Sequence, residues 1–192
     1  LRLIHITDTH AQLDPMYFRE PNFNIGVGVN KNTPPHIVGS KLLDYYSIDN
    51  SLLRYAYTHL DFNQHAQEFG KFGGYAYLKT LIDTLKSQAN NKCLLLDGGD
   101  TWQGSGLSLL ENGKDMVQAS NLLGVDAMTG HWEFTFGEEI FLENLRNFNG
   151  DFVAQNISLT EEAIFEGLEA VDDDNHFQKP YVVKTINGSR VA

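Results

Sequence analysis

Short apolar segments that end in polar clusters alternate with amphipathic helical segments along this chain, and this alternation constrains the fold more than any other feature. The segment 1–7 alternates and is rich in β-forming residues, while 94–97 is apolar up to its last residue. Hydrophobic side chains recur at helical spacing within 74–88. Strand and helix in alternation predict an α/β fold, with ligand sites beyond the carboxyl ends of the strands.

Further elements follow the same pattern. Segments 115–123 and 140–148 have helical spacing, and Gly124 closes the first of them. The dipeptide Asn187-Gly188 after 181–186 is typical of a β-hairpin with a type I′ turn. The remaining predicted elements are short helices at 40–46 and 51–59, a turn or two from an N-cap at Asp61 to Gly70, strands at 125–128 and 152–155, and a loop at 130–137.

The segment from 14 to about 39 has no periodicity and is rich in Asn, Gly and Pro. A loop of this length inside a compact domain is usually either functional or disordered. Its aromatic residues Tyr17, Phe18 and Phe23 favour an ordered flap that packs on another part of the protein. We therefore expect a flap insertion at about 14–70, beside any site that the strand ends form.

Composition excludes several function classes. The 192 residues include 25 acidic and 14 basic side chains, so the net charge is −11, and such a field repels nucleic acids and anionic membranes. No apolar run is long enough to span a membrane, and no basic leader precedes the first strand. Cys93 is the single cysteine, which excludes an internal disulfide and a cysteine-based zinc cluster.

Three polar clusters follow three successive predicted strands. The first is Asp8-Thr9-His10, in which two side chains two residues apart on an extended segment can point to one side and share a metal ion. The second reaches Asp100, and the third contains His131. Each cluster alone is a common surface pattern. Three of them at successive strand ends favour a single metal site.

Asp100 has the properties of a bridging ligand. Gly98 and Gly99 let the backbone turn sharply, so that the carboxylate of Asp100 is presented from the edge of the sheet. A carboxylate has two oxygens and can bridge two cations, whereas imidazole cannot. Asp97 competes for this role, but it lies at the end of the apolar run. We expect Asp97 to hold the loop through backbone hydrogen bonds.

The three motifs, in this order, resemble those of the calcineurin-like metallophosphoesterase superfamily, in its 5′-nucleotidase branch. The resemblance implies that Asp8 and His10 bind a first metal ion, that Asp100 bridges, and that His131 binds a second ion. The segment 154–157 also resembles a strand end of that family. The resemblance covers most of the chain apart from the flap.

The resemblance also implies a fold, an α/β sandwich of two mixed sheets flanked by helices. The segment 1–192 would be the N-terminal part of this metallophosphoesterase domain, truncated at the C-terminus, with the flap at about 14–70 as an insertion. The family contributes further metal-binding histidines downstream of these motifs. We therefore expect the isolated chain to be inactive.

The third motif departs from the nucleotidase pattern at two positions. The metal-binding Asn of the nucleotidases is His131 here, an exchange that preserves metal binding because imidazole nitrogen suits the same divalent ions. Their catalytic His is Trp132 here, and an indole cannot donate a proton of useful acidity. This second change argues against ordinary phosphomonoester hydrolysis.

This variant motif, together with segments 7–13, 19–21, 58–62 and 97–104, resembles the SoxB family of thiosulfohydrolases. That resemblance implies a dimetal hydrolase of the thiosulfate oxidation pathway, which releases sulfate from a cysteine S-sulfonate on the sulfur-carrier protein SoxYZ. It also implies two divalent metal ions, most commonly manganese in that family, and a periplasmic location.

Under this resemblance a hydroxide held by the metal ions would attack, and no side chain would take a further catalytic role. The leaving group is a thiol, with a pKa of about 8.5, which departs near neutral pH with little protonation. A nucleoside alkoxide benefits far more from a general acid. Trp132 and Trp102, beside the expected ligands, and Arg19, in the flap, are the candidate substrate-pocket residues.

Two alternatives remain open at the level of the sequence. The first is a 5′-nucleotidase or related phosphoesterase, which would hydrolyse a nucleotide and lose this activity with a chelator. The second is a binding module without catalysis, in which the flap binds a partner and no metal is retained.

Overall fold

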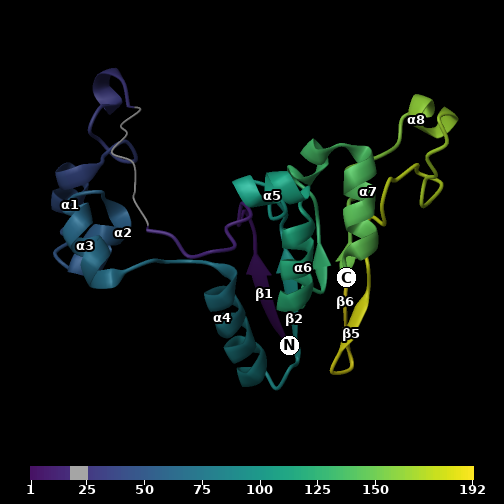
Figure 1. The fold of residues 1–192 in the computed structure, drawn as a ribbon, viewed down its shortest axis with the longest axis horizontal. Helices are drawn as coiled ribbons and strands as arrows, with labels where there is room; N and C mark the ends of the chain where they lie inside the picture. Colours follow the sequence, from purple (N-terminus) through teal and green to yellow (C-terminus); the bar gives the residue numbers. More distant parts are fainter. Residues whose placement is uncertain (18–25) are drawn as a thin grey trace. The chain divides into compact units, whose positions relative to one another are not determined.

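The computed structural model describes residues 1–17 and 26–192. Arg19, Phe18 and Phe23, to which the sequence assigned roles in the flap, lie outside the described residues. The chain forms two compact units (Figure 1). The first contains Leu1–Leu13 together with Tyr75–Ala192, and the second contains Asp14–Gly74.

The first unit is built on a parallel sheet of four strands in the order β1-β2-β3-β4. These strands are β1 (Arg2–Ile6), β2 (Cys93–Asp97), β3 (Ala127–Met128) and β4 (Asp151–Phe152). Ile6 pairs with Asp97, and Asp97 pairs with Met128, so the carboxyl ends of the first three strands are in register. Whatever follows these strands therefore meets at a single edge of the sheet.

Helices connect the strands (Figure 1). They are α4 (Tyr75–Gln88), α5 (Gly106–Glu111), α6 (Lys114–Leu123), the 3₁₀-helix η2 (Glu133–Phe136), α7 (Glu138–Asn147) and α8 (Glu161–Phe165). The strand order runs in one direction, so right-handed crossovers put α4, α6 and α7 on the same face of the sheet. In agreement with this, α6 packs against both α4 and α7.

The core of the first unit lies between these helices and the sheet. Ile82 of α4, Leu95 of β2, Met116 of α6 and Phe141 of α7 are all almost fully buried within it. On β1 the side chain of Ile4 belongs to this core, while Leu3, on the opposite face, is half exposed. The alternation that predicted a strand at 1–7 thus reflects a sheet covered by helices on one side.

A two-stranded antiparallel ribbon follows the parallel sheet. It consists of β5 (Lys184–Ile186) and β6 (Ser189–Val191). Asn187 and Gly188 both have positive φ, at 52° and 79°, which confirms the predicted type I′ turn. The α/β class is also confirmed. Two mixed sheets were expected, whereas in the first unit the four-stranded sheet is wholly parallel and the ribbon is antiparallel.

The second unit is helical. It contains the 3₁₀-helix η1 (Gly28–Asn30) and the helices α1 (Gly39–Tyr46), α2 (Ser51–Tyr57) and α3 (Phe62–Phe69). Tyr55 is buried, and rings of four residues surround it with centroid distances of 5.5–6.1 Å. These residues are Phe62, His65, Phe69 and Phe72. An aromatic cluster thus gives this unit a small core of its own.

The second unit begins and ends at adjoining points of the main chain. Within it, Met16 and Phe72 exchange two backbone hydrogen bonds, of 2.9 and 2.7 Å. Next to it, the N–H of Tyr75 donates to the carbonyl of Leu13 at 2.9 Å. The main chain therefore leaves the first unit and returns to it at two residues, Leu13 and Tyr75, that are joined by a backbone hydrogen bond.

The predicted N-cap at Asp61 and the end of this helix at Gly70 are confirmed, although the side chain of Asp61 forms no capping bond and pairs instead with Arg54, at 3.6 Å. Other local predictions were incomplete. The segment 130–137 was expected to be a loop, yet four of its residues form η2. Helices α5 and α8 were not predicted. Among the described residues no helix has the length and apolar character needed to cross a membrane.

Candidate metal centre

The carboxyl edge of the parallel sheet brings together the side chains that the three motifs predicted. Asp8, Asp100 and His131 each offer a ligand atom, and these atoms lie within 4.8 Å of one another. The Nε2 atom of His10 lies 3.4 Å from the Oδ2 atom of Asp100. Three of the four candidate ligands therefore form one group, and His10 adjoins it through Asp100, as expected from strands whose carboxyl ends are in register.

Asp100 is the centre of this cluster. One of its oxygens, Oδ2, lies 3.1 Å from Nδ1 of His131 and 3.4 Å from Nε2 of His10. Its other oxygen, Oδ1, accepts a hydrogen bond from the side-chain amide of Gln103. The carboxylate is 5% exposed, whereas the two imidazoles are more than half exposed. A buried carboxylate between two accessible imidazoles fits a divalent cation, because oxygen and imidazole nitrogen are its usual protein ligands.

The backbone of the cluster is strained. Asp8, His10 and Asp100 have φ angles of 53°, 49° and 58°, in the left-handed region that residues other than glycine rarely adopt. Two backbone hydrogen bonds of 2.9 Å hold this conformation, from Asp8 to Gly99 and from His10 to the carbonyl of Asp100. Strain of this kind persists where the surrounding structure fixes it, and it concentrates at functional sites.

The glycine turn before Asp100 has the predicted role. Gly99 has a φ of +89°, and a Cβ at this position would lie 2.8 Å from the carbonyl oxygen of Thr129. The loop that carries Asp100 therefore approaches the loop after β3 more closely than any larger residue would permit. This approach brings Asp100 within reach of His131.

Asp97, the last residue of β2, holds the same loop through hydrogen bonds. Its Oδ1 atom accepts the backbone N–H of Gly99 at 3.0 Å, and both of its oxygens lie 2.9 Å from the hydroxyl of Thr101. Burial raises the pKa of Asp97 to about 6, against the lowering effect of these hydrogen bonds. Asp97 thus makes the loop contacts expected from the sequence, and it does not belong to the ligand cluster.

Glu133 is a structural residue of the site that the sequence reasoning missed. Its side chain is fully buried, and it accepts backbone N–H groups from the loop of Asp100 and from His131. The only signal in the sequence was its position two residues after His131. That position alone does not distinguish a buried acceptor from a solvated carboxylate.

The two tryptophans have different environments. The prediction that Trp102 lines a substrate pocket is wrong, because its side chain is fully buried and packs on Phe141 and Phe148. Its indole N–H donates to Ser120 of α6 at 3.3 Å. Trp132, in contrast, is 55% exposed and lies beside His131, with ring centroids 6.2 Å apart. Trp132 is therefore the aromatic side chain that remains available to a ligand of the cluster.

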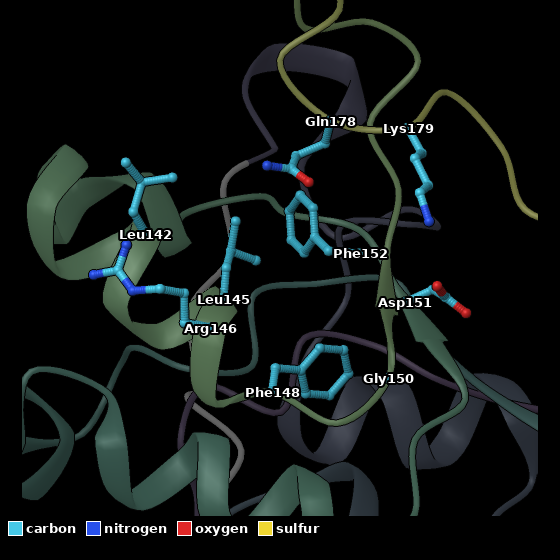
Figure 2. Close-up of a pocket in the computed structure, with 9 residues that line it drawn as sticks. All are labelled: Leu142, Leu145, Arg146, Phe148, Gly150, Asp151, Phe152, Gln178 and Lys179. Carbon is cyan, nitrogen blue, oxygen red and sulfur yellow. The ribbon is translucent and has the colours of Figure 1, made fainter. Parts of the chain in front are cut away.

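A separate pocket of about 290 Å³ lies between the end of α7, the segment before β4 and residues 178–179 (Figure 2). Its lining includes Arg146, Lys179 and Asp151. Asp151 is already paired with Lys184, at 2.7 Å. The pocket contains none of the four candidate ligands, so it is distinct from the metal cluster.

Comparison with known proteins adds to this geometry. No family model matches the chain. It is 32% identical to sulfate thiohydrolase SoxB of Thermus thermophilus, whose structure was solved in complex with glycerol, with a TM-score of 0.72. The match covers 98% of this chain and 33% of that one. A rat 5′-nucleotidase is 37% identical over 87 residues, which are 44% of this chain and 15% of the rat protein.

In sequence and fold the chain is similar to the 5′-nucleotidase branch of the calcineurin-like phosphoesterases. A calcineurin-like phosphoesterase of Bacillus subtilis, YfkN, has the same fold at 22% identity and a TM-score of 0.53, over 98% of this chain and 44% of its own. The phosphoesterase fold implies a divalent-metal site, and the cluster around Asp100 is its candidate here. The chain spans a third of the length of SoxB.

Proposed function

We propose that this chain belongs to a metal-dependent thiosulfohydrolase, which releases sulfate from a cysteine S-sulfonate on a sulfur-carrier protein. The observation that carries the proposal is the exposed indole of Trp132 beside His131. In the nucleotidase pattern this position belongs to the catalytic histidine. The identity to SoxB over 98% of the chain supports the same choice.

The reaction explains why an indole is tolerated at this position. Water adds to the sulfonate sulfur, the bond between the two sulfurs breaks, and its electron pair leaves with the cysteine sulfur. The products are sulfate and a thiol. A thiol has a pKa of about 8.5, so the thiolate departs near neutral pH without a general acid. A nucleoside alkoxide is far more basic and requires a proton, which the weakly acidic indole of Trp132 cannot donate.

The residues of the cluster would hold the metal ions. Asp8 and His10 would bind one ion, His131 the other, and Asp100 both. When bound, such ions supply Lewis acidity and a nucleophile at neutral pH. Asp100 would connect the two ion sites, since one of its oxygens lies near the imidazoles of both His10 and His131. The indole of Trp132 would exclude water beside the sulfonate and form a wall of its pocket.

We further propose manganese as the metal, SoxYZ as the carrier protein and the periplasm as the location. Carboxylate oxygen and imidazole nitrogen both suit manganese, although they bind other divalent ions as well. The carrier and the compartment follow from the resemblance to the SoxB family.

The test uses the protein that contains this chain, loaded with Mn²⁺, and a peptide with an S-sulfonated cysteine. We expect sulfate release that stops with EDTA and returns when Mn²⁺ is added. His131→Ala should abolish it, while the exposed Glu139→Gln should not. Adenosine monophosphate serves as the competing substrate. Faster release of phosphate from it than of sulfate from the peptide would contradict the proposal.

A 5′-nucleotidase or related phosphoesterase is the second candidate. The identity to the rat 5′-nucleotidase over 87 residues favours it. The same pair of substrates distinguishes the two functions, because a nucleotidase needs a proton donor for its alkoxide and would have to take it from a residue other than Trp132.

A further inference from the structure

Glu133 connects two loops of the metal centre through a single carboxylate. Its Oε1 atom accepts the backbone N–H groups of Thr101, at 2.6 Å, and of Trp102, at 3.2 Å. Its Oε2 atom accepts those of Asp100, at 3.2 Å, and of His131, at 2.7 Å. Both oxygens are thus fully engaged by main-chain donors from segments that follow different strands.

The environment of this carboxylate is unusual. Glu133 is 0% exposed, and among the described residues no Lys, Arg or His forms an ion pair with it. Its charged neighbours include Asp97, another acid. A buried carboxylate is costly unless hydrogen bonds replace its water. Four backbone N–H groups supply this replacement, in the manner of a backbone anion nest.

The same bonds determine where two of the candidate ligands lie. One atom, Oε2, holds the backbone nitrogens of both Asp100 and His131, so these residues cannot separate without breaking a bond to it. Their side chains meet on the other side, with Nδ1 of His131 at 3.1 Å from Oδ2 of Asp100. Asp100 also keeps its left-handed φ of 58° in this arrangement.

We propose that Glu133 is a positioning residue, which sets the affinity of the centre for its metal ions by fixing the main chain of Asp100 and His131. It does not bind metal itself, since both of its oxygens point to backbone donors. Supporting residues of this kind typically contribute 10–100-fold to metal affinity. The proposal depends on the metal centre alone and holds for either substrate class.

The test compares Glu133→Gln with the unchanged protein that contains this chain, in the absence of substrate. Glutamine has the same shape, but its NH₂ group would face two of the four N–H donors. We expect Mn²⁺ affinity, measured by titration of the free-ion EPR signal, to fall roughly 10–100-fold. We also expect the spectrum of the bound ions to change from that of a coupled pair towards that of isolated ions.

The control removes an equal charge from the surface. Glu139 lies in the first turn of α7 and is exposed, so Glu139→Gln should leave both readouts unchanged. Unchanged Mn²⁺ affinity and spectrum in a folded Glu133→Gln protein would overturn the proposal. If that variant does not fold, Glu133→Asp decides. It keeps the charge but is too short to reach both loops, so wild-type affinity in Glu133→Asp would equally overturn it.

Failure here is distinguishable from failure of the thiosulfohydrolase proposal. The metal titration involves no substrate, so its result is independent of which ester or sulfonate the enzyme hydrolyses. Absent sulfate release with normal Mn²⁺ binding would contradict the proposed function, while a weakened affinity in Glu133→Gln would still support the positioning role.

Discussion

The hydroxyl oxygen of Tyr75 lies 2.8 Å from the hydroxyl oxygen of Thr9, the residue between two candidate metal ligands. The hydroxyl of Thr9 also lies 3.4 Å from that of Thr101, which in turn contacts Asp97. A chain of hydrogen bonds thus runs from the first residue of α4 to the loops after β1 and β2. This chain supports both motifs from the side of the core.

Removing one hydroxyl from this chain should loosen the first motif. We expect Tyr75→Phe to lower the free energy of unfolding by about 1 kcal/mol, the typical value of such a bond, and to weaken Mn²⁺ binding. Burial raises the pKa of Tyr75 well above its usual value, so the hydroxyl stays neutral and the effect should be the same from pH 6 to 9. Urea denaturation measures it. The exposed Tyr77→Phe, in the same helix, should have no effect; equal losses in the two variants would contradict this prediction.

Asp97 should make the stability of the protein depend on pH. Burial raises its pKa from 3.8 to about 6, so between these values the folded protein binds more protons than the unfolded chain. This contribution to stability is therefore present at low pH and lost as the pH rises through about 6, by about 3 kcal/mol at most. Asp97→Asn should remove this dependence in urea denaturation with EDTA at pH 4 to 7. Parallel pH curves for the two proteins would show that the pKa is not raised.

Trp132→His should restore a proton donor beside the metal centre. Because Trp132 is half exposed, the exchange should cost little stability. We expect hydrolysis of adenosine monophosphate to rise on the order of 100-fold, the lower range of general acid catalysis. A nitrophenyl phosphate, whose leaving group is much less basic, should gain little. Trp132→Phe is the control and should gain nothing. Strong nucleotide hydrolysis by the natural protein would refute the leaving-group argument.

Gly104 and Gly106 form a matched pair for testing the main chain behind His10. Gly104 has a φ of +122°, and a Cβ there would lie 2.7 Å from the carbonyl oxygen of His10. Gly104→Ala should therefore destabilise the fold by roughly 1–3 kcal/mol and weaken Mn²⁺ binding. Gly106, at the start of α5, has open space around it, so Gly106→Ala should be neutral or slightly stabilising. Thermal unfolding of both variants tests this contrast, and equal shifts would contradict it.

The 192-residue chain by itself should bind Mn²⁺ weakly and be inactive. Two ions held about 3.5–4 Å apart repel each other and require a full set of ligands. The four candidate ligands described above would leave each ion with several waters, so that it exchanges readily. Metal quantification after dialysis tests this prediction. Two retained manganese ions per chain would mean that further residues of the chain complete the centre.

The sequence predicted the candidate ligands at the edge of the sheet better than the buried residues that support them. Spacing and strand ends brought Asp8, Asp100 and His131 together correctly, because parallel strands in register impose this meeting whatever the loops do. Trp102 was misplaced because its neighbour Asp100 suggested a pocket, whereas the left-handed turn at Asp100 directs the next residues into the core. Glu133 was missed because its partners are main-chain groups, which carry no sequence signal.

Short elements could not be predicted from the sequence either. Helix α5 begins at Gly106 and has only six residues, so its pattern is too short to define a period. Its capping residue, Ser105, is recognisable only in hindsight, since its side chain accepts the N–H of Ser108. The aromatic cluster around Tyr55 likewise depends on contacts between helices that are separate in the sequence.

The backbone hydrogen bond between Leu13 and Tyr75 has an evolutionary consequence. Because the main chain leaves and returns at one point, the whole segment Asp14–Gly74 is equivalent to a single closed loop inserted into the first unit. The entropy of closing such a loop grows slowly, by about 0.6 kcal/mol for each doubling of its length. During evolution this segment could therefore be replaced by a longer, shorter or unrelated one while the candidate metal centre stays unchanged. New binding partners could be acquired in this way without a change in the catalytic chemistry.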